Sequence, residues 1–290
     1  METGNRTSES PANTTSSSGR FPADTELGNL HLSLLWDQAS FAYSLLNKSS
    51  RTFTLTTEQL FPNNREDGWK NAWTETGIKQ DRLASAGVLY ATPKFTLIPK
   101  GIYSEDASRD VLAFNHPLSE EDSVMAHPCP LAQAVLLYAI PRSHKTWLTD
   151  TFKGIHISHP MVVLIESMLK RYRNQDSPRL LLHVHEGHAD VLVTKGAGLQ
   201  LANTFVTNVP EDVLYYVLFT MEQLELNPEN TQVGLAGDIH RDSPLYELLS
   251  RYLPQTVFEE SSDQLKLGDA LRSIPAHRYF TLYHEFLCES

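Results

Sequence analysis

The sequence contains few cysteines, no long apolar segment and no excess of basic residues. Its two cysteines, Cys129 and Cys288, lie far apart without CxxC or Cys/His spacing, so the chain builds neither a disulfide framework nor a zinc knuckle. The best apolar stretch, residues 131–140, has about half the length that a transmembrane helix requires. The net charge of −11 disfavours a nucleic-acid interface over the whole surface. These absences predict a cytoplasmic protein with no membrane span and no nucleic-acid partner.

The sequence also lacks the short motifs of the common nucleotide-binding proteins and hydrolases. It contains no GxxxxGKS/T phosphate loop, no GxGxxG dinucleotide motif and no GxSxG nucleophile elbow. Gly196-Ala197-Gly198 lacks a third glycine and opens a predicted strand instead of a helix. No reaction follows from these residues, and the sequence favours a protein that is not an enzyme.

Residues 1–26 differ in composition from the rest of the chain. Residues 1–20 consist mainly of Ser, Thr, Asn and Gly, with Met1 and Ala12 as the aliphatic residues, so they cannot contribute to a hydrophobic core. No apolar stretch follows that would complete a secretory signal peptide. We predict a disordered tail over residues 1–26 and a folded region from residue 27.

The first part of the folded region begins with three predicted strands. Apolar, alternating and β-branched residues predict strands at residues 31–36, 40–46 and 51–57, joined by turns at 37–39 and 47–50. The remaining predicted elements of this part are helices at 69–79, 105–114, 142–152 and 160–172 and strands at 95–99, 134–140 and 155–158.

A polar segment at residues 171–178, ending in Pro178, is the best linker in the chain. It separates a predicted first lobe, residues 27–174, from a second lobe, residues 175–290. The second lobe again begins with three strands. Its predicted elements are strands at 179–186, 188–195, 199–206, 231–236 and 256–258 and helices at 210–224, 242–252 and from 276 onward.

Both lobes therefore follow the order β-β-β-α-β-α, which indicates an internal duplication of one supersecondary unit. This order resembles the actin-like (ribonuclease H-like) superfamily of actins, sugar kinases and 70-kilodalton heat-shock chaperones. Within it, the chain is most similar to the bacterial actin-like proteins of pilus assembly and cell division. The resemblance implies an α/β fold with two duplicated lobes that face a central cleft.

A narrower resemblance covers residues 181–258 well and the first lobe more loosely. The segments 190–195, 203–205, 211–219 and 222–224, together with Gly237, are similar to a bacterial family of unknown function assigned to the actin-like fold. Because that family has no established activity, the resemblance implies an architecture and not a reaction.

ATP-using actin-like proteins need an Asp-x-Gly turn in the first hairpin of each lobe, where glycine admits phosphate and aspartate holds the metal. Here the first turn, residues 36–40, has a carboxylate and no glycine, and the second, residues 185–188, has them in another order. An acid also follows the glycine after the strand at 231–236. No cofactor is therefore predicted, and the alternative is ATP with Mg²⁺. The candidate cleft residues are Asp37, Glu186, Gly187, Gly237 and Asp238.

A dense group of histidines raises the question of a metal site. His183 and His185 are two residues apart on one predicted strand and share a face, so both rings can reach one ion, whereas His188 lies beyond the turn. The plainer interpretation is that these are sheet and turn residues paired with neighbours or water. We predict no metal, with His183 and His185 as the candidates for one.

These observations leave three hypotheses from different classes. The first is a non-catalytic actin-like scaffold with degenerate nucleotide motifs that binds another protein or a second copy of itself. The second is an actin-like switch that retains weak ATP binding, and the third is an enzyme of unrecognised chemistry. An open cavity shared by Asp37, Gly187 and Gly237 would favour the second hypothesis, and a cleft filled by Trp36 would favour the first.

Overall fold

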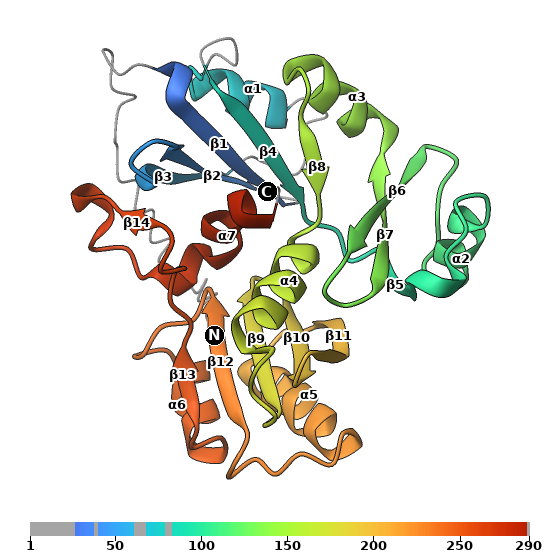
Figure 1. Cartoon of the computed structure of the whole chain (residues 1–290), viewed down its shortest axis with the longest axis vertical. Helices are drawn as coiled ribbons and strands as arrows, with labels where there is room; N and C mark the ends of the chain where they lie inside the picture. Colours follow the sequence, from blue (N-terminus) through green and yellow to red (C-terminus); the bar gives the residue numbers. More distant parts are fainter. Residues whose placement is uncertain (1–26, 38–39, 61–67, 79–82, 289–290) are drawn as a thin grey trace, which may run out of the picture.

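The computed structural model describes residues 27–37, 40–60, 68–78 and 83–288. Its strands form two large sheets, one above the other in Figure 1, and a smaller sheet to one side. The predicted tail, residues 1–26, lies outside the described residues. No helix within these ranges is long and apolar enough to cross a lipid bilayer.

The first large sheet has six strands in the described part of the chain. Three of them form an antiparallel meander, two continue it in parallel, and a short strand closes the other edge. Most residues in the first two strands are buried on both faces, which explains their nearly continuous apolar sequence. The strands are β1 (Leu30–Trp36), β2 (Ser40–Asn47), β3 (Thr52–Leu60), β4 (Ser85–Tyr90), β8 (His156–Ser158) and β14 (Lys266–Leu267).

The second large sheet repeats this arrangement. Its strands are β9 (Arg179–His185), β10 (His188–Lys195), β11 (Gly198–Val206), β12 (Gln232–Gly237) and β13 (Thr256–Phe258). The order β11-β10-β9-β12-β13 corresponds, strand by strand and with the same directions, to β3-β2-β1-β4-β8 of the first sheet. The predicted duplication is therefore confirmed.

Helices occupy matching places in the two halves. One follows each meander, one precedes the last strand of each half, and one follows that strand. In chain order these helices are α1 (Gly68–Glu75), α3 (Arg142–Thr151), α4 (Pro160–Tyr172), α5 (Pro210–Gln223), α6 (Pro244–Tyr252) and α7 (Phe280–Cys288). Short 3-10 helices cover Leu27–Asn29, Lys100–Ile102, Asp269–Leu271 and Ala276–Tyr279.

The first half also contains an insertion without a counterpart in the described second half. Between β4 and α3 the chain forms a three-stranded sheet, β5 (Phe95–Pro99), β7 (Ala134–Pro141) and β6 (Asp122–Cys129), with α2 (Ser108–Asn115) beside it. The sequence analysis missed β4 and β6. Strand β4 contains Gly87 and does not alternate because it is a parallel interior strand, and β6 is polar and contains Pro128.

Two helices join the halves. Helix α4 lies between the sheets and contacts β10, β11 and α7 (Figure 1). Strand β14 pairs with β3, and α7 contacts β1, β2 and β4. Strand β14 and helix α7 therefore lie with the first sheet, whereas the 3-10 helix Ala276–Tyr279 between them contacts β12 of the second sheet. The predicted lobe bounds, residues 27–174 and 175–290, stay a prediction.

A buried polar contact fixes α7 on the first sheet. Ser33 Oγ donates a hydrogen bond of 2.6 Å to Glu285 Oε2, and His31 Nε2 lies 2.8 Å from the same oxygen. All three residues are at least 98% buried. A carboxylate in such an environment is tolerated because its partners replace the lost water.

We expect Glu285→Ala to lower the free energy of unfolding by about 3 kcal/mol, because it leaves His31 and Ser33 buried without this acceptor. Urea unfolding followed by circular dichroism measures the change. Glu247→Ala is the control, since Glu247 is 77% exposed in its ion pair with Arg251 and its loss should cost under about 0.5 kcal/mol. Equal effects of the two variants would contradict an anchoring role for Glu285.

Candidate functional site

A cavity of about 440 Å³ lies between the two halves. The first half contributes Asp37 and residues 91–93, and the start of α4 contributes Pro160 and the preceding His159. The second half contributes residues from β9, β10, β11 and the turn between β9 and β10. A second cavity of about 580 Å³ lies beside α4 and α7. None of the residues predicted for the cleft lines that second cavity, so we place the candidate site in the first.

Asp37 directly follows β1 and lines the cavity. Its backbone N–H donates to the carbonyl oxygen of Ser40 at 3.0 Å, which closes the turn into β2. The residue thus occupies the position that the sequence predicted, at the first turn of the first half.

The turn between β9 and β10 also faces the cavity. His185 pairs with His188 across the hairpin, so Glu186 and Gly187 form a two-residue turn. Gly187 has φ +79°, a conformation that favours glycine, and its carbonyl oxygen accepts from Thr207 N–H at 3.0 Å. Glu186 and Gly187, which the sequence proposed for the cleft, both line this cavity.

Gly237 and Asp238 do not line the cavity, although the sequence proposed both for the cleft. Gly237 has φ +83°, and a Cβ there would lie 2.1 Å from the carbonyl oxygen of Val184, so this glycine serves backbone contact between β12 and β9. The Asp238 N–H donates to the same oxygen at 2.8 Å. The Asp238 side chain is 60% exposed and lies 3.5 Å from His240.

Trp36 does not fill the cavity either. Its indole is buried in the first half, stacked on His144 at a centroid distance of 4.7 Å and in contact with Trp69 and Tyr90. The observation that would have favoured the first hypothesis, a cleft filled by Trp36, is therefore not made.

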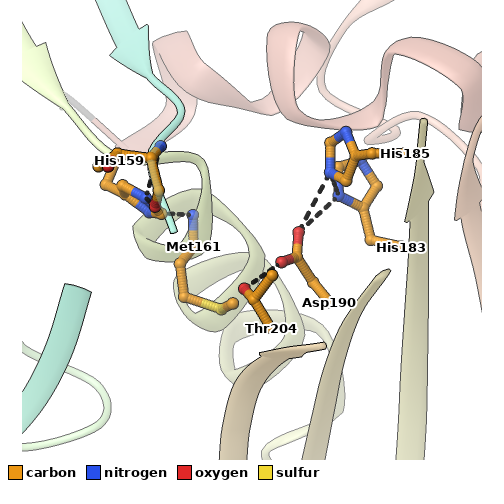
Figure 2. A network of polar contacts seen from close by, with 7 residues as sticks. His159, Met161, His183, His185, Asp190 and Thr204 are labelled. Atoms are coloured by element: carbon orange, nitrogen blue, oxygen red, sulfur yellow. Dashed lines mark hydrogen bonds and ion pairs between the residues drawn. The ribbon is translucent and has the colours of Figure 1, made fainter. Parts of the chain in front are cut away.

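The polar centre of the cavity wall is a group of four side chains on β9, β10 and β11. His183 pairs in register with Asp190, and Asp190 pairs with Thr204, so the three lie side by side across the strands. Asp190 Oδ2 lies 3.1 Å from His183 Nδ1 and 3.2 Å from His185 Nε2. Thr204 Oγ1 donates to Asp190 Oδ1 at 2.6 Å. Figure 2 shows these side chains pointing toward one another.

Burial and pairing shift the pKa values of this group. Burial by itself would raise the pKa of Asp190, but hydrogen bonds from the two histidines hold it well below its usual range. Burial and the neighbouring His185 lower the pKa of His183 to about 4. Burial also disfavours charge on His185, yet the hydrogen bond and charge of Asp190 raise its pKa above the ordinary value. Asp190 is therefore an ionised acceptor at neutral pH.

The cavity is rich in carboxylates and lacks strong cations. Asp37, Glu186 and Asp190 line it, and no lysine or arginine is among its described lining residues. A polyphosphate entering it would meet acidic groups without a basic side chain to balance them.

The sequence analysis missed His159, Asp190 and Thr204. The last two were within reach, because a two-residue turn at Glu186-Gly187 sets the register that places Asp190 opposite His183. His159, the residue before α4, lies apart from the Asp190 group in Figure 2. Its place at the cavity depends on how α4 packs, which strand patterns do not contain.

Comparisons with known proteins agree with the fold. The profile of a family described as "protein of unknown function (DUF3822)" matches residues 22–256. The chain belongs to this family. No curated protein matches the chain.

Two solved structures share the architecture. A Bacteroides thetaiotaomicron protein with an actin-like ATPase fold and unknown function is 22% identical, covers 80% of this chain and 91% of its own, and has a TM-score of 0.73. The PilM-PilN type IV pilus biogenesis complex contains a chain that is 12% identical, with 90% and 98% coverage and a TM-score of 0.57. This DUF3822 protein therefore has an actin-like fold, as predicted.

The buried His159 makes the free energy of unfolding of this protein depend on pH. Burial lowers its pKa to about 4, so the folded protein keeps it neutral while the unfolded chain protonates it near pH 6.5. Between these values the unfolded chain binds more protons, so the free energy of unfolding falls as the pH falls. We expect His159 to account for about 2 kcal/mol of loss from pH 7 to pH 5.

Urea unfolding at pH 7, 6 and 5 checks this expectation. His159→Gln, which cannot be protonated there, should reduce the pH dependence by about 2 kcal/mol whatever its effect at pH 7. Phe114→Ser, at an exposed position that cannot be protonated, should leave the pH dependence as in the wild type. A wild-type slope in His159→Gln would show that His159 is protonated equally in both states.

Proposed function

We propose that this protein is a non-catalytic actin-like scaffold that binds an extended segment of another protein. The observation that carries the proposal is an exposed aromatic face on α5. Tyr215 and Phe219 are 60% and 43% exposed, and their rings stack at a centroid distance of 5.9 Å. Contiguous large apolar side chains on a solvent-exposed surface favour contact with another protein.

Strand β11 lies beside this face and is the first strand in its sheet order. Phe205 of β11 stacks on Tyr216 of α5 at a centroid distance of 4.4 Å, which connects the strand to the helix. Val206, at the end of β11, is 68% exposed. In the described sheet β11 pairs with β10 alone, so its outer edge can accept a further strand.

Charge around the aromatic face indicates the chemistry of the partner segment. Exposed Glu211 and Glu222 lie on the same face of α5 as Tyr215 and Phe219, at helical spacings of four, four and three residues. The partner that fits is an extended segment with apolar side chains flanked by Lys or Arg. The net charge of −11 also favours a positively charged partner segment.

The cleft supports the non-catalytic part of the proposal. Its lining carboxylates disfavour a polyphosphate, and Gly237 is used for backbone packing instead of approaching a ligand. The second candidate, an ATP-dependent switch, is favoured by the open cavity of about 440 Å³ that Asp37 and Gly187 line.

Nucleotide binding separates the two candidates. A ligand at a hundredfold excess over its dissociation constant stabilises a protein by about 2.7 kcal/mol, which a thermal-shift assay detects as a change of several degrees. We expect no shift with millimolar Mg-ATP relative to Mg²⁺ alone, and no phosphate release above background. A shift that Asp37→Asn abolishes would contradict the scaffold and establish the switch.

Partner binding is tested with the native chain as bait. The double variant Tyr215→Ser/Phe219→Ser should retain at least about tenfold less of the partner than the wild type does, because aromatic contacts dominate such interfaces. Phe114→Ser is the matched control, since Phe114 on α2 is 90% exposed and lies outside the proposed surface.

The bound protein should be retained equally by the wild type and the control. Its interacting peptide should contain the apolar and basic pattern described above. Equal binding by all three proteins would place the interface elsewhere. Sedimentation velocity distinguishes a second copy of this chain, because self-association then depends on the same two substitutions.

A further inference from the structure

Three ligand-type atoms meet on the wall of the cavity at distances that suit a common partner. His183 Nδ1 lies 2.8 Å from His185 Nε2, and Asp190 Oδ2 lies 3.1 and 3.2 Å from these nitrogens. All three atoms are within 4.8 Å of one another, and His183 and Asp190 are buried. We call this arrangement the His-His-Asp triangle; the sequence offered His183 and His185 as metal candidates without Asp190.

No arrangement of the imidazole N–H protons makes all three contacts of the triangle favourable. The carboxylate of Asp190 accepts and cannot donate when ionised, and each neutral imidazole carries one N–H. If both nitrogens donate to Asp190, two N–H groups face each other across 2.8 Å. If His183 Nδ1 accepts from His185 instead, its lone pair faces the carboxylate at 3.1 Å. One side is repulsive in either case, whereas a cation would be attracted by all three lone pairs.

We propose that His183, His185 and Asp190 bind one zinc-class divalent cation, with a further ligand position open to the cavity. Two imidazoles and one carboxylate form a donor set that suits zinc and its first-row neighbours. Tetrahedral zinc ligands about 2.0–2.1 Å from the metal lie about 3.3 Å apart, close to the spacings of the triangle.

The residues and strands around the His-His-Asp triangle favour metal binding. Thr204 Oγ1 donates to the other oxygen of Asp190 at 2.6 Å and orients the carboxylate, as outer hydrogen bonds do at metal sites. His185 and Asp190 line the cavity, so water or an anionic group in the cavity can complete the coordination. The three ligands sit on adjacent paired strands, β9 and β10, which keeps their spacing fixed before any ion binds.

The inference is independent of the proposed scaffold function, because it concerns a metal and not a protein partner. It is tested on the full chain after treatment with EDTA, by calorimetric titration with zinc and by elemental analysis of the dialysed protein. We expect saturation at one zinc per chain. Cobalt should bind in its place and give the visible absorption of a four-coordinate ion.

Variants decide whether the bound ion occupies the triangle. Asp190→Asn and His185→Ala should each weaken zinc binding by more than about 100-fold, and Thr204→Val by about 10- to 100-fold. His240→Gln is the matched control, because His240 and Asp238 form another His/Asp pair at 3.5 Å that is exposed, and it should bind as the wild type does.

Two results would overturn the inference. One is the absence of stoichiometric zinc binding by the wild type, and the other is equal affinity in Asp190→Asn, His185→Ala and the wild type. Circular dichroism of the metal-free variants checks that they fold. If Asp190→Asn does not fold, His185→Ala decides, because His185 is 15% exposed and its loss perturbs the sheet least.

Discussion

The arrangement of the whole molecule depends on the burial of α4 between the two large sheets. Its residues Leu164 and Ile165 are fully buried and join a core that includes Leu181 and Leu192 of the second sheet. Each such side chain contributes about 1.5–3 kcal/mol by leaving water. Because α4 is held on both sides, the sheets have a fixed relation, and the cavity forms where its first turn, at His159, meets the turns of the strands.

The cavity lies between the two halves, and its described lining carries carboxylates without lysine or arginine. Its wall combines Asp37, Glu186 and a buried His/Asp group, with the carboxylate of Asp190 stabilised by histidines instead of by lysine or arginine. Such a wall attracts a cation and repels a polyphosphate. The same charge pattern therefore supports both the absence of ATP chemistry that we propose and a metal at the His-His-Asp triangle.

The two halves share one topology, but each has structural features that the other lacks. The first half contains the inserted sheet of β5, β6 and β7 and is closed by α7, which Glu285 anchors to β1. The second half exposes an edge strand and the aromatic face of Tyr215 and Phe219 on α5. The two halves therefore share the duplicated sheet topology and differ in the inserted sheet and in the surface exposed on α5.

The sequence by itself indicated most of the strands and helices and the duplication, because strands, helices and short turns follow from neighbouring residues. It did not indicate β4, β6 and β14. It even contained the pairing of His183 with Asp190, which a two-residue turn dictates. Tertiary structure alone decided that Gly237 packs on Val184, that Trp36 lies in a core away from the cleft and that β14 and α7 return to the first sheet. These outcomes depend on contacts between residues far apart in the chain, whose energies no local pattern records.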